Sequence, residues 1–127
     1  MITFEAWIYK AKNDLKSAKK LLDGSDPIMD TAVYHTQQCA EKALKGYLSF
    51  KQQPLKKSHD IELLVEICMA IDVEFEKLYE YSENLTPYAT AFRYPDIYLE
   101  PDYDEVQEAI EMAREILEFV EKKLLEI

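Results

Sequence analysis

The chain has 127 residues, of which 48% are hydrophobic and only two are glycine, and its net charge is −10. This length suits a single domain over residues 1–127 with a buried core. The scarcity of glycine argues against turn-rich β folds and glycine-rich phosphate loops, and the acidity argues against non-specific nucleic-acid binding by the whole surface. No apolar run is long enough to span a membrane and the amphipathic start lacks a signal-peptide core, so we expect a cytoplasmic protein without membrane contact.

The first two helices are predicted from periodicity and from the residues between them. Apolar residues recur at three- and four-residue steps over residues 3–22, as in an amphipathic helix. Gly24 is placed to end this helix, because glycine tolerates the left-handed conformation that commonly follows one. Asp26 and Pro27 suit an N-cap and a first helical position, so we expect a second helix over residues 27–50.

Residues 32–50 are the part of this second helix around which we expect the fold to be organised. One face is apolar at helical spacing. The opposite face mixes small, polar and titratable side chains: His35, Gln38, Cys39, Lys42, Gly46 and Ser49. Because glycine costs a helix interior roughly 1 kcal/mol relative to alanine, Gly46 predicts a close approach by another segment. We interpret the helix as central, with His35, Cys39 and Gly46 facing a cleft, a partner or a second subunit.

Helical spacing continues in three further segments, over residues 61–71 and 74–84 and in a last helix that starts near residue 103. Ser58 or Asp60 can cap the first of these, and Asp102 with Glu105 resembles a capping box for the last. Between the last two lies an irregular stretch rich in proline and tyrosine. We therefore predict an all-α fold, an antiparallel up-and-down bundle of four long helices plus a short fifth helix.

Charge is divided unevenly along the chain. Residues 1–59 hold ten lysines and six acids, a balance of +4, whereas residues 60–127 hold five basic and nineteen acidic residues, a balance of −14. The segment from Lys42 to His59 contains five lysines and no acid. This local basic segment indicates a specific anion site; the alternative is a solvated lysine face that also matches the acidic half of a dimer mate.

Several kinds of chemistry are excluded by counting. Neither histidine completes a Glu-x-x-His pair, and there is no CxxC, P-loop or HExxH motif, so we expect no metal and no cofactor. Cys39 and Cys68 are expected as reduced thiols, although a disulfide is an alternative. Cys39 lies one helical turn after His35, but no residue is placed to orient that histidine, so we predict no catalytic residue.

The candidate ligand-binding residues are polar and come from three short segments: His35, Gln38, Lys42, Lys45, His59, Asp60, Arg93 and Asp96. Each segment also has a structural interpretation. His35 can form a hydrogen bond across a helix interface, the residues around Asp60 can cap a helix, and Arg93 can pair with a nearby acid. The sequence alone leaves these alternatives open.

The chain resembles the HEPN family (higher eukaryotes and prokaryotes nucleotide-binding) over nearly its whole length. The similarity lies in AVYHTQQCAEKALKGYLSF, in the following KKSHDIELL and in the later FRYPD. It implies a small up-and-down bundle of four or five helices that is usually a homodimer. It also implies partnership with a minimal nucleotidyltransferase encoded nearby, in some cases as a toxin–antitoxin pair.

Many members of that family are metal-independent ribonucleases that use an arginine followed, four to six residues later, by a histidine. The only arginines here are Arg93 and Arg114, and no histidine follows either one. Acid–base help from such a histidine is typically worth about 10²–10⁴ in rate. The resemblance therefore predicts a non-catalytic module that binds a nucleotide, RNA or another phosphate-bearing ligand. The alternative is a ribonuclease with a rearranged site that uses His35 or His59 beside Arg93.

Overall fold

The structure is a computed structural model that describes residues 2–90 and 100–126. In chain order its helices are α1 (Phe4–Leu22), α2 (Met29–Phe50), α3 (Ile61–Ile71), the 3₁₀ helix η1 (Val73–Leu78), α4 (Tyr79–Leu85), the 3₁₀ helix η2 (Thr86–Ala89) and α5 (Tyr103–Leu125). No strand occurs in these two ranges. The predicted all-α bundle is therefore confirmed. The predicted site residues Arg93 and Asp96 lie outside the described residues.

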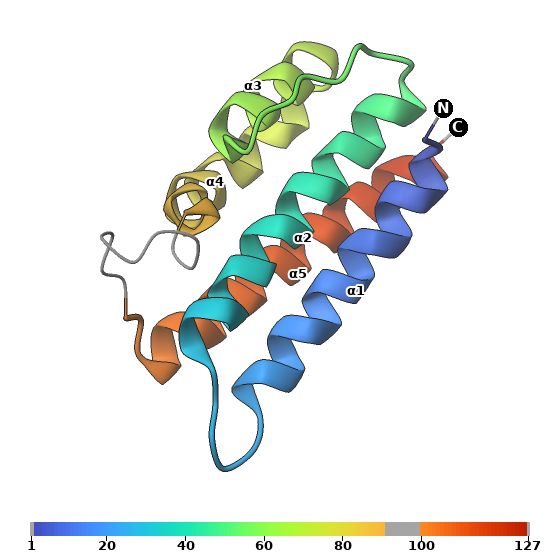
Figure 1. Cartoon of the computed structure of the whole chain (residues 1–127). Coiled ribbons are helices and arrows are strands. Elements are labelled where there is room, and N and C mark those ends of the chain that lie inside the picture. The colour runs from blue at the N-terminus through green and yellow to red at the C-terminus, as the bar shows by residue number, and fades with distance from the viewer. Residues whose placement is uncertain (1, 91–99, 127) are drawn as a thin grey trace.

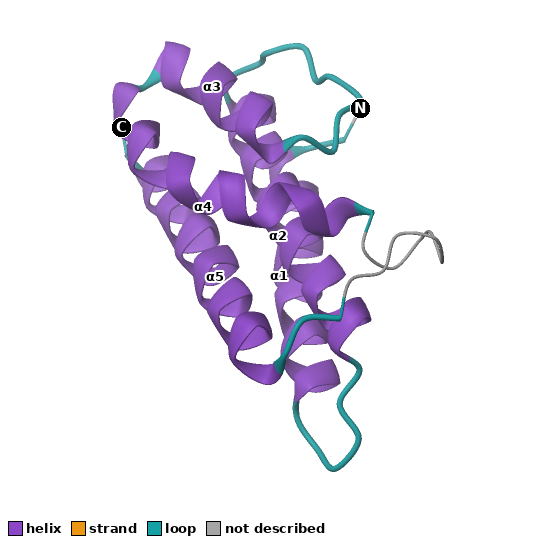
Figure 2. Ribbon diagram, turned by 90° about the vertical axis from the view of Figure 1, so that its left-hand side faces the viewer, coloured by secondary structure: helices purple, strands orange, loops and turns teal. Residues whose placement is uncertain are grey.

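Three long helices, α1, α2 and α5, lie side by side, and the shorter α3 and α4 pack beside α2 and α5 (Figures 1 and 2). α1 runs opposite to α2 and α5, and both chain ends lie at the same end of the bundle (Figure 1). α2 is the central helix, because fourteen of its 22 residues are buried. Its apolar face contributes Val33, Ala40, Leu44 and Leu48 to the core.

The helix starts follow the predicted caps at α3 and α5, and Thr3 caps α1 in the same way. The side chains of Thr3, Asp60 and Asp102 accept hydrogen bonds from the backbone N–H three residues further on. The predicted start of α2 is wrong by two residues. The Ile28 N–H donates to the Leu21 carbonyl at 2.9 Å, so the chain is still tied to the end of α1 there, and α2 begins at Met29.

The predicted helix over residues 74–84 is split into η1 and α4. Asp72 ends α3, and its side chain accepts the Glu74 N–H at 3.0 Å. The tighter 3₁₀ winding places residues three apart on one side, which suits Phe75 and Leu78, both of them buried. The spacing of these two residues is compatible with an α-helix as well, so the sequence did not distinguish the two.

Lys123 fastens the end of α5 to the α3–η1 junction. Its Nζ lies 2.9 Å from Asp72 Oδ2 and 2.7 Å from Glu74 Oε1. Hydrogen bonds from Lys123 hold the pKa of Asp72 and of Glu74 below their ordinary values. The folded state therefore binds fewer protons than the unfolded chain, and this stabilisation is lost as the pH falls through the lowered pKa values.

We therefore expect Lys123→Met to flatten the acid limb of the stability profile, between about pH 6 and pH 3. Thermal unfolding of both proteins across that range measures the effect. Lys122→Met is the matched control, because Lys122 is an exposed neighbour. An acid limb that stays as steep in Lys123→Met as in the wild type would contradict this account.

Candidate functional site

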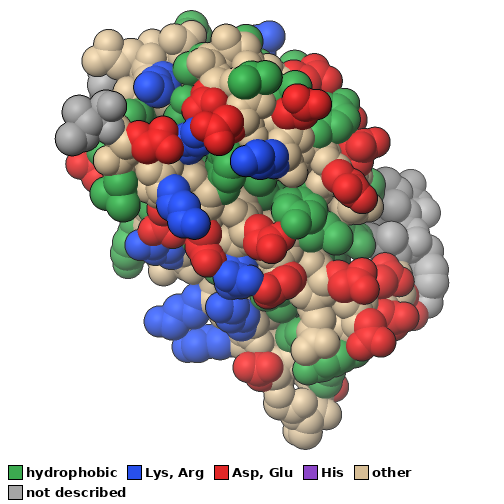
Figure 3. Space-filling view, turned by 180° about the vertical axis from the view of Figure 1, so that it is seen from behind, with side chains coloured by type: hydrophobic (Ala, Val, Ile, Leu, Met, Phe, Trp, Pro, Cys, Tyr) green, Lys and Arg blue, Asp and Glu red, His purple; other side chains and the backbone are tan. Residues whose placement is uncertain are grey.

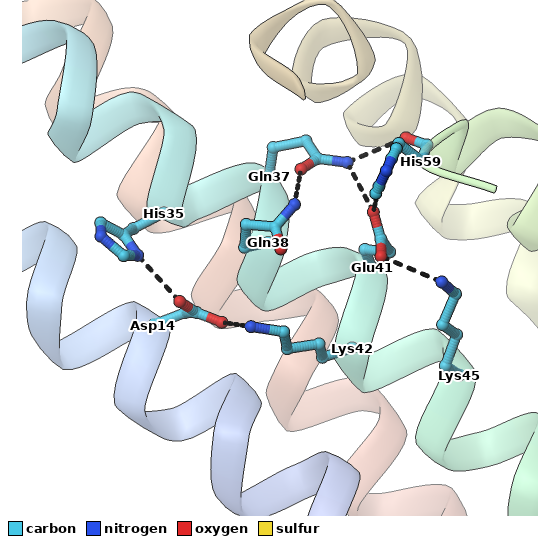
Figure 4. Close-up of polar contacts among 8 residues, drawn as sticks. All are labelled: Asp14, His35, Gln37, Gln38, Glu41, Lys42, Lys45 and His59. Atoms are coloured by element: carbon cyan, nitrogen blue, oxygen red, sulfur yellow. Dashed lines mark hydrogen bonds and ion pairs between the residues drawn. The ribbon is translucent and has the colours of Figure 1, made fainter. Parts of the chain in front are cut away.

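The first polar cluster joins α1 to α2 through one buried carboxylate. Asp14 of α1 is 7% exposed. Its Oδ1 lies 2.8 Å from His35 Nδ1, and its Oδ2 accepts from Lys42 Nζ at 2.6 Å (Figure 4). His35 and Lys42 are two helical turns apart on α2 and so share a face. The structure thus gives His35 the hydrogen bond across a helix interface that was one of its two predicted interpretations.

The second polar cluster joins α2 to the loop that precedes α3. Glu41 lies 3.0 Å from Lys45 Nζ and 2.8 Å from His59 Nδ1 (Figure 4). Gln37 Nε2 donates to Glu41 and also to the backbone carbonyl of His59, at 3.2 and 2.8 Å. Gln38 Nε2 in turn donates to Gln37 Oε1 at 2.7 Å. These bonds hold the loop against α2.

The two carboxylates neutralise the two lysines of α2. Lys42 pairs with Asp14, and Lys45 pairs with Glu41 and lies 5.7 Å from the centre of the Trp7 ring. A buried charge is costly unless it is paired, so these contacts are what allow Lys45 to be buried. The prediction of an anion site did not include the two acids, and it therefore overestimated the free positive charge at Lys42 and Lys45.

Each histidine is oriented by its carboxylate. An ionised carboxylate only accepts hydrogen bonds, so Nδ1 of His35 and of His59 carries the proton. Nε2 of each ring points away from its carboxylate, and no described residue bonds to it in either case. The His59 side chain is 54% exposed and that of His35 is 27% exposed, so a ligand can reach both rings.

Cys39 and Gly46 lie inside the chain's own core. Cys39 is fully buried, with Sγ 3.9 Å from the Ala113 carbonyl of α5, and burial raises the pKa of its thiol. A Cβ at Gly46 would lie 2.9 Å from Ile8 Cδ1. The close approach predicted at Gly46 is therefore present, but α1 of the same chain makes it. This corrects the expectation that both residues face a cleft or a second molecule.

The remaining candidates are placed as follows. Asp60 is the N-cap of α3, accepting from the Leu63 N–H at 3.3 Å, which is its predicted structural role.

Both cysteines are free, and burial raises the pKa of Cys68 to about 12. Because the thiolate is the reactive form, neither thiol is activated as a nucleophile. In the described ranges, no three His, Cys, Asp or Glu side chains are grouped to hold a metal ion.

Asp14, Gln37 and Glu41 are the site residues that sequence reasoning missed. Asp14 occupies the apolar stripe of α1 with Ala11, Leu15 and Ala18, and an acid in that stripe is a signal for a buried partner. Glu41 precedes Lys45 by four residues, a spacing typical of helical ion pairs. Both signals were present in the sequence.

Comparison with known proteins places this geometry in a family. The HEPN domain model matches residues 4–123. The chain belongs to the HEPN family. The archaeal HEPN homologue ST0689 is 30% identical with a TM-score of 0.77, over 98% of this chain and 99% of that one. TT1696 from Thermus thermophilus is 32% identical with a TM-score of 0.83, over 97% of this chain and 99% of that one. No curated protein matches significantly.

In this HEPN domain the two histidines come from different segments of the chain. His35 is on α2 and His59 is in the loop before α3, whereas Arg93 falls outside the described residues. Each ring is held by a carboxylate from the same chain. Across the ranges that the structure describes, no helix is both long and apolar enough to cross a bilayer.

Proposed function

We propose that this HEPN domain is a non-catalytic module that acts through protein partnership. It forms a homodimer and docks a minimal nucleotidyltransferase, as in a toxin–antitoxin pair. The family's ribonucleases need a histidine shortly after their arginine, and neither Arg93 nor Arg114 has one downstream. The proposal therefore assigns the function to binding surfaces rather than to a reaction centre.

The observation that carries the proposal is the location of the uncompensated charge. On α2, Lys42 and Lys45 are neutralised by acids of the same chain. Residues 60–127, in contrast, hold a balance of −14. Lysines gather toward one edge of the molecule, and acids dominate the opposite edge (Figure 3). We define the acidic edge by exposed residues of α4 and α5: Glu80, Glu83, Glu105 and Glu108. Such an edge suits a basic protein surface and speeds the encounter with it.

Affinity capture of the tagged full-length chain from its native host tests the proposal. We expect the neighbouring nucleotidyltransferase to co-purify in stoichiometric amount and to dissociate as salt is raised, because exposed charges are screened. Glu83→Lys with Glu108→Lys should release it. Asp26→Lys, in the exposed α1–α2 loop, is the control for reversal of a charge elsewhere. Recovery of this chain without a nucleotidyltransferase would contradict the proposal.

A phosphate-bearing ligand is the second candidate, and a separate observation favours it. Nε2 of His35 and Nε2 of His59 have no hydrogen bond to a described residue, and a protonated imidazole ring would donate from that atom to a phosphate oxygen. Lys56 and Lys57 precede His59, and both are exposed without an ion pair to a described residue. A nucleotide or RNA phosphate held there would lie between the loop and α2.

Calorimetric titration with AMP and with inorganic phosphate tests this candidate. We expect binding at low salt that weakens by roughly tenfold or more in His59→Ala, because a hydrogen bond to a charged group is worth about 1.5–3 kcal/mol. Lys10→Ala on α1 is the control. Absence of heat with the wild type would remove the candidate.

The wild-type protein should also leave mixed RNA intact. RNA cleavage that disappears in the double variant His35→Ala with His59→Ala would favour the ribonuclease alternative.

A further inference from the structure

The outer side of the α1–α5 pair is a surface that the polar clusters on α2 do not use. The two helices run in opposite directions side by side (Figure 1). An ion pair joins them, with Lys12 Nζ 3.1 Å from Glu121 Oε2. We define the α1–α5 face by six residues along this seam: Tyr9, Lys12 and Lys19 of α1, and Glu111, Glu121 and Leu125 of α5.

One end of this face combines an apolar hollow with projecting apolar side chains. A groove of about 380 Å³ lies between the helices, lined in part by Phe4, Ile8 and Leu124. Tyr9 and Leu125 line the same groove, and they are 62% and 82% exposed. Burial of apolar side chains contributes about 25 cal/mol per Å² of area removed from water, so their exposure is unfavourable in an isolated chain.

The other end of the face carries a second hollow, whose lining is mostly charged or polar. A hollow of about 620 Å³ lies between the last turn of α1 and the start of α5, with Leu22 and Ile110 in its lining. Tyr103 lines the same hollow and is 43% exposed. Each end of the face therefore carries a hollow together with an exposed apolar side chain. In a second copy of the chain, the side chain at one end could fill the hollow at the corresponding end of the first copy.

The charges between the two ends are arranged in two stripes. The α1 side of the seam carries Lys12, Lys16 and Lys19, and the α5 side carries Glu111, Glu118 and Glu121. Arg114 of α5 pairs with Glu111 and with Glu118, so these four α5 residues, three acids and one arginine, keep a net charge of −2. Such a face is complementary to a second copy of itself when the basic stripe of each copy lies against the acidic stripe of the other.

We propose that a second copy of this chain packs on the α1–α5 face, about a two-fold axis that runs along the seam parallel to both helices. This inference rests on the homodimer of the proposed function and names its surface. The axis keeps every residue at its own level and places α1 of each copy against α5 of the other. Lys12 then meets the partner's Glu121, and Tyr9 meets the partner's Leu125.

Charge selects this axis over the alternative. A two-fold axis across the helices would lay α1 on α1 and α5 on α5, which brings lysines onto lysines and glutamates onto glutamates. Like charges in contact cost several kcal/mol at an interface. The size of the face is also adequate: two adjacent helices, each about 28 Å long and about 10 Å across, present a strip of roughly 560 Å². A corrugated surface exceeds its flat projection, so this approaches the roughly 800 Å² per partner of a standard interface.

A pair of charge-reversed variants tests the arrangement. One variant carries Lys12→Glu and Lys19→Glu, and the other carries Glu111→Lys and Glu121→Lys. Each should be monomeric alone in sedimentation velocity, with a dimer Kd raised roughly tenfold or more. An equal mixture should recover a dimer of one copy of each, identified by its mass. Mixing the two variants does not relieve repulsion between like charges within one chain. Recovery of the mixed dimer therefore reports the charge contacts between chains.

An apolar variant provides an independent test. Tyr9→Asp with Leu125→Asp should abolish the dimer while leaving the far-UV circular dichroism unchanged, because both side chains are exposed in the single chain. Val73→Asp on η1, also an exposed apolar position, should leave it intact. If the variants of this face stay dimeric and their mixture forms no mixed dimer, the face is wrong although the homodimer stands. A wild-type chain that is monomeric would overturn both.

Discussion

Replacing Glu41 by alanine is expected to lower the free energy of unfolding by about 3–5 kcal/mol. Glu41 is 4% exposed, and Lys45, which it neutralises, is 8% exposed. The substitution leaves the Lys45 ammonium buried without a counter-charge, and His59 and Gln37 each lose a partner. Urea unfolding at neutral pH, followed by circular dichroism, measures the loss.

Two controls isolate the cause of that loss. Adding Lys45→Met to Glu41→Ala removes the unpaired charge and should restore much of the stability, since an apolar side chain can replace a buried ion. Glu118→Ala removes an exposed partner of Arg114 and should cost no more than about 1 kcal/mol. A similarly small loss for Glu41→Ala would show that the buried cluster does not hold the loop to α2.

Replacing Gly46 by leucine is expected to cost about 1–3 kcal/mol, and more if α1 cannot move. A Cβ at this position would meet Ile8 Cδ1 at 2.9 Å and Trp7 Cβ at 3.3 Å, so a larger side chain has to push α1 away from α2. The midpoint of thermal unfolding should fall, and helical content at low temperature should change little.

The matched control for Gly46→Leu is Ala6→Leu, which adds similar bulk at an exposed position of α1. Combining Gly46→Leu with Ile8→Ala returns space at the contact and should recover part of the loss. If Gly46→Leu is as stable as the wild type and changes only the oligomeric state, the close contact between α1 and α2 is not what this glycine serves.

Much of the fold could be predicted because its determinants are local. Thr3, Asp60 and Asp102 act on backbone groups three residues away, and the apolar stripes of α1 and α5 repeat within each helix. The start of α2 could not be predicted in the same way. It depends on the hydrogen bond from the Ile28 N–H to the Leu21 carbonyl, which closes the loop around Gly24 and leaves Asp26 and Pro27 outside the helix.

The candidate site was harder to predict because its partners come from elsewhere in the chain. His35 and Lys42 were identified as polar residues of α2, but their partner Asp14 lies on another helix. The acid-free segment of residues 42–59 describes local composition, and the acids that neutralise its lysines lie just before it on α2 or on α1. Gly46 was correctly interpreted as a close approach, whereas the identity of the neighbour required the fold.

Native mass spectrometry of the complex isolated from its host tests the central claim most directly. The account predicts an assembly that contains two copies of this HEPN domain together with a nucleotidyltransferase, and that leaves RNA uncleaved. A single copy without a protein partner, with RNA cleavage that depends on His35 or His59, would contradict it.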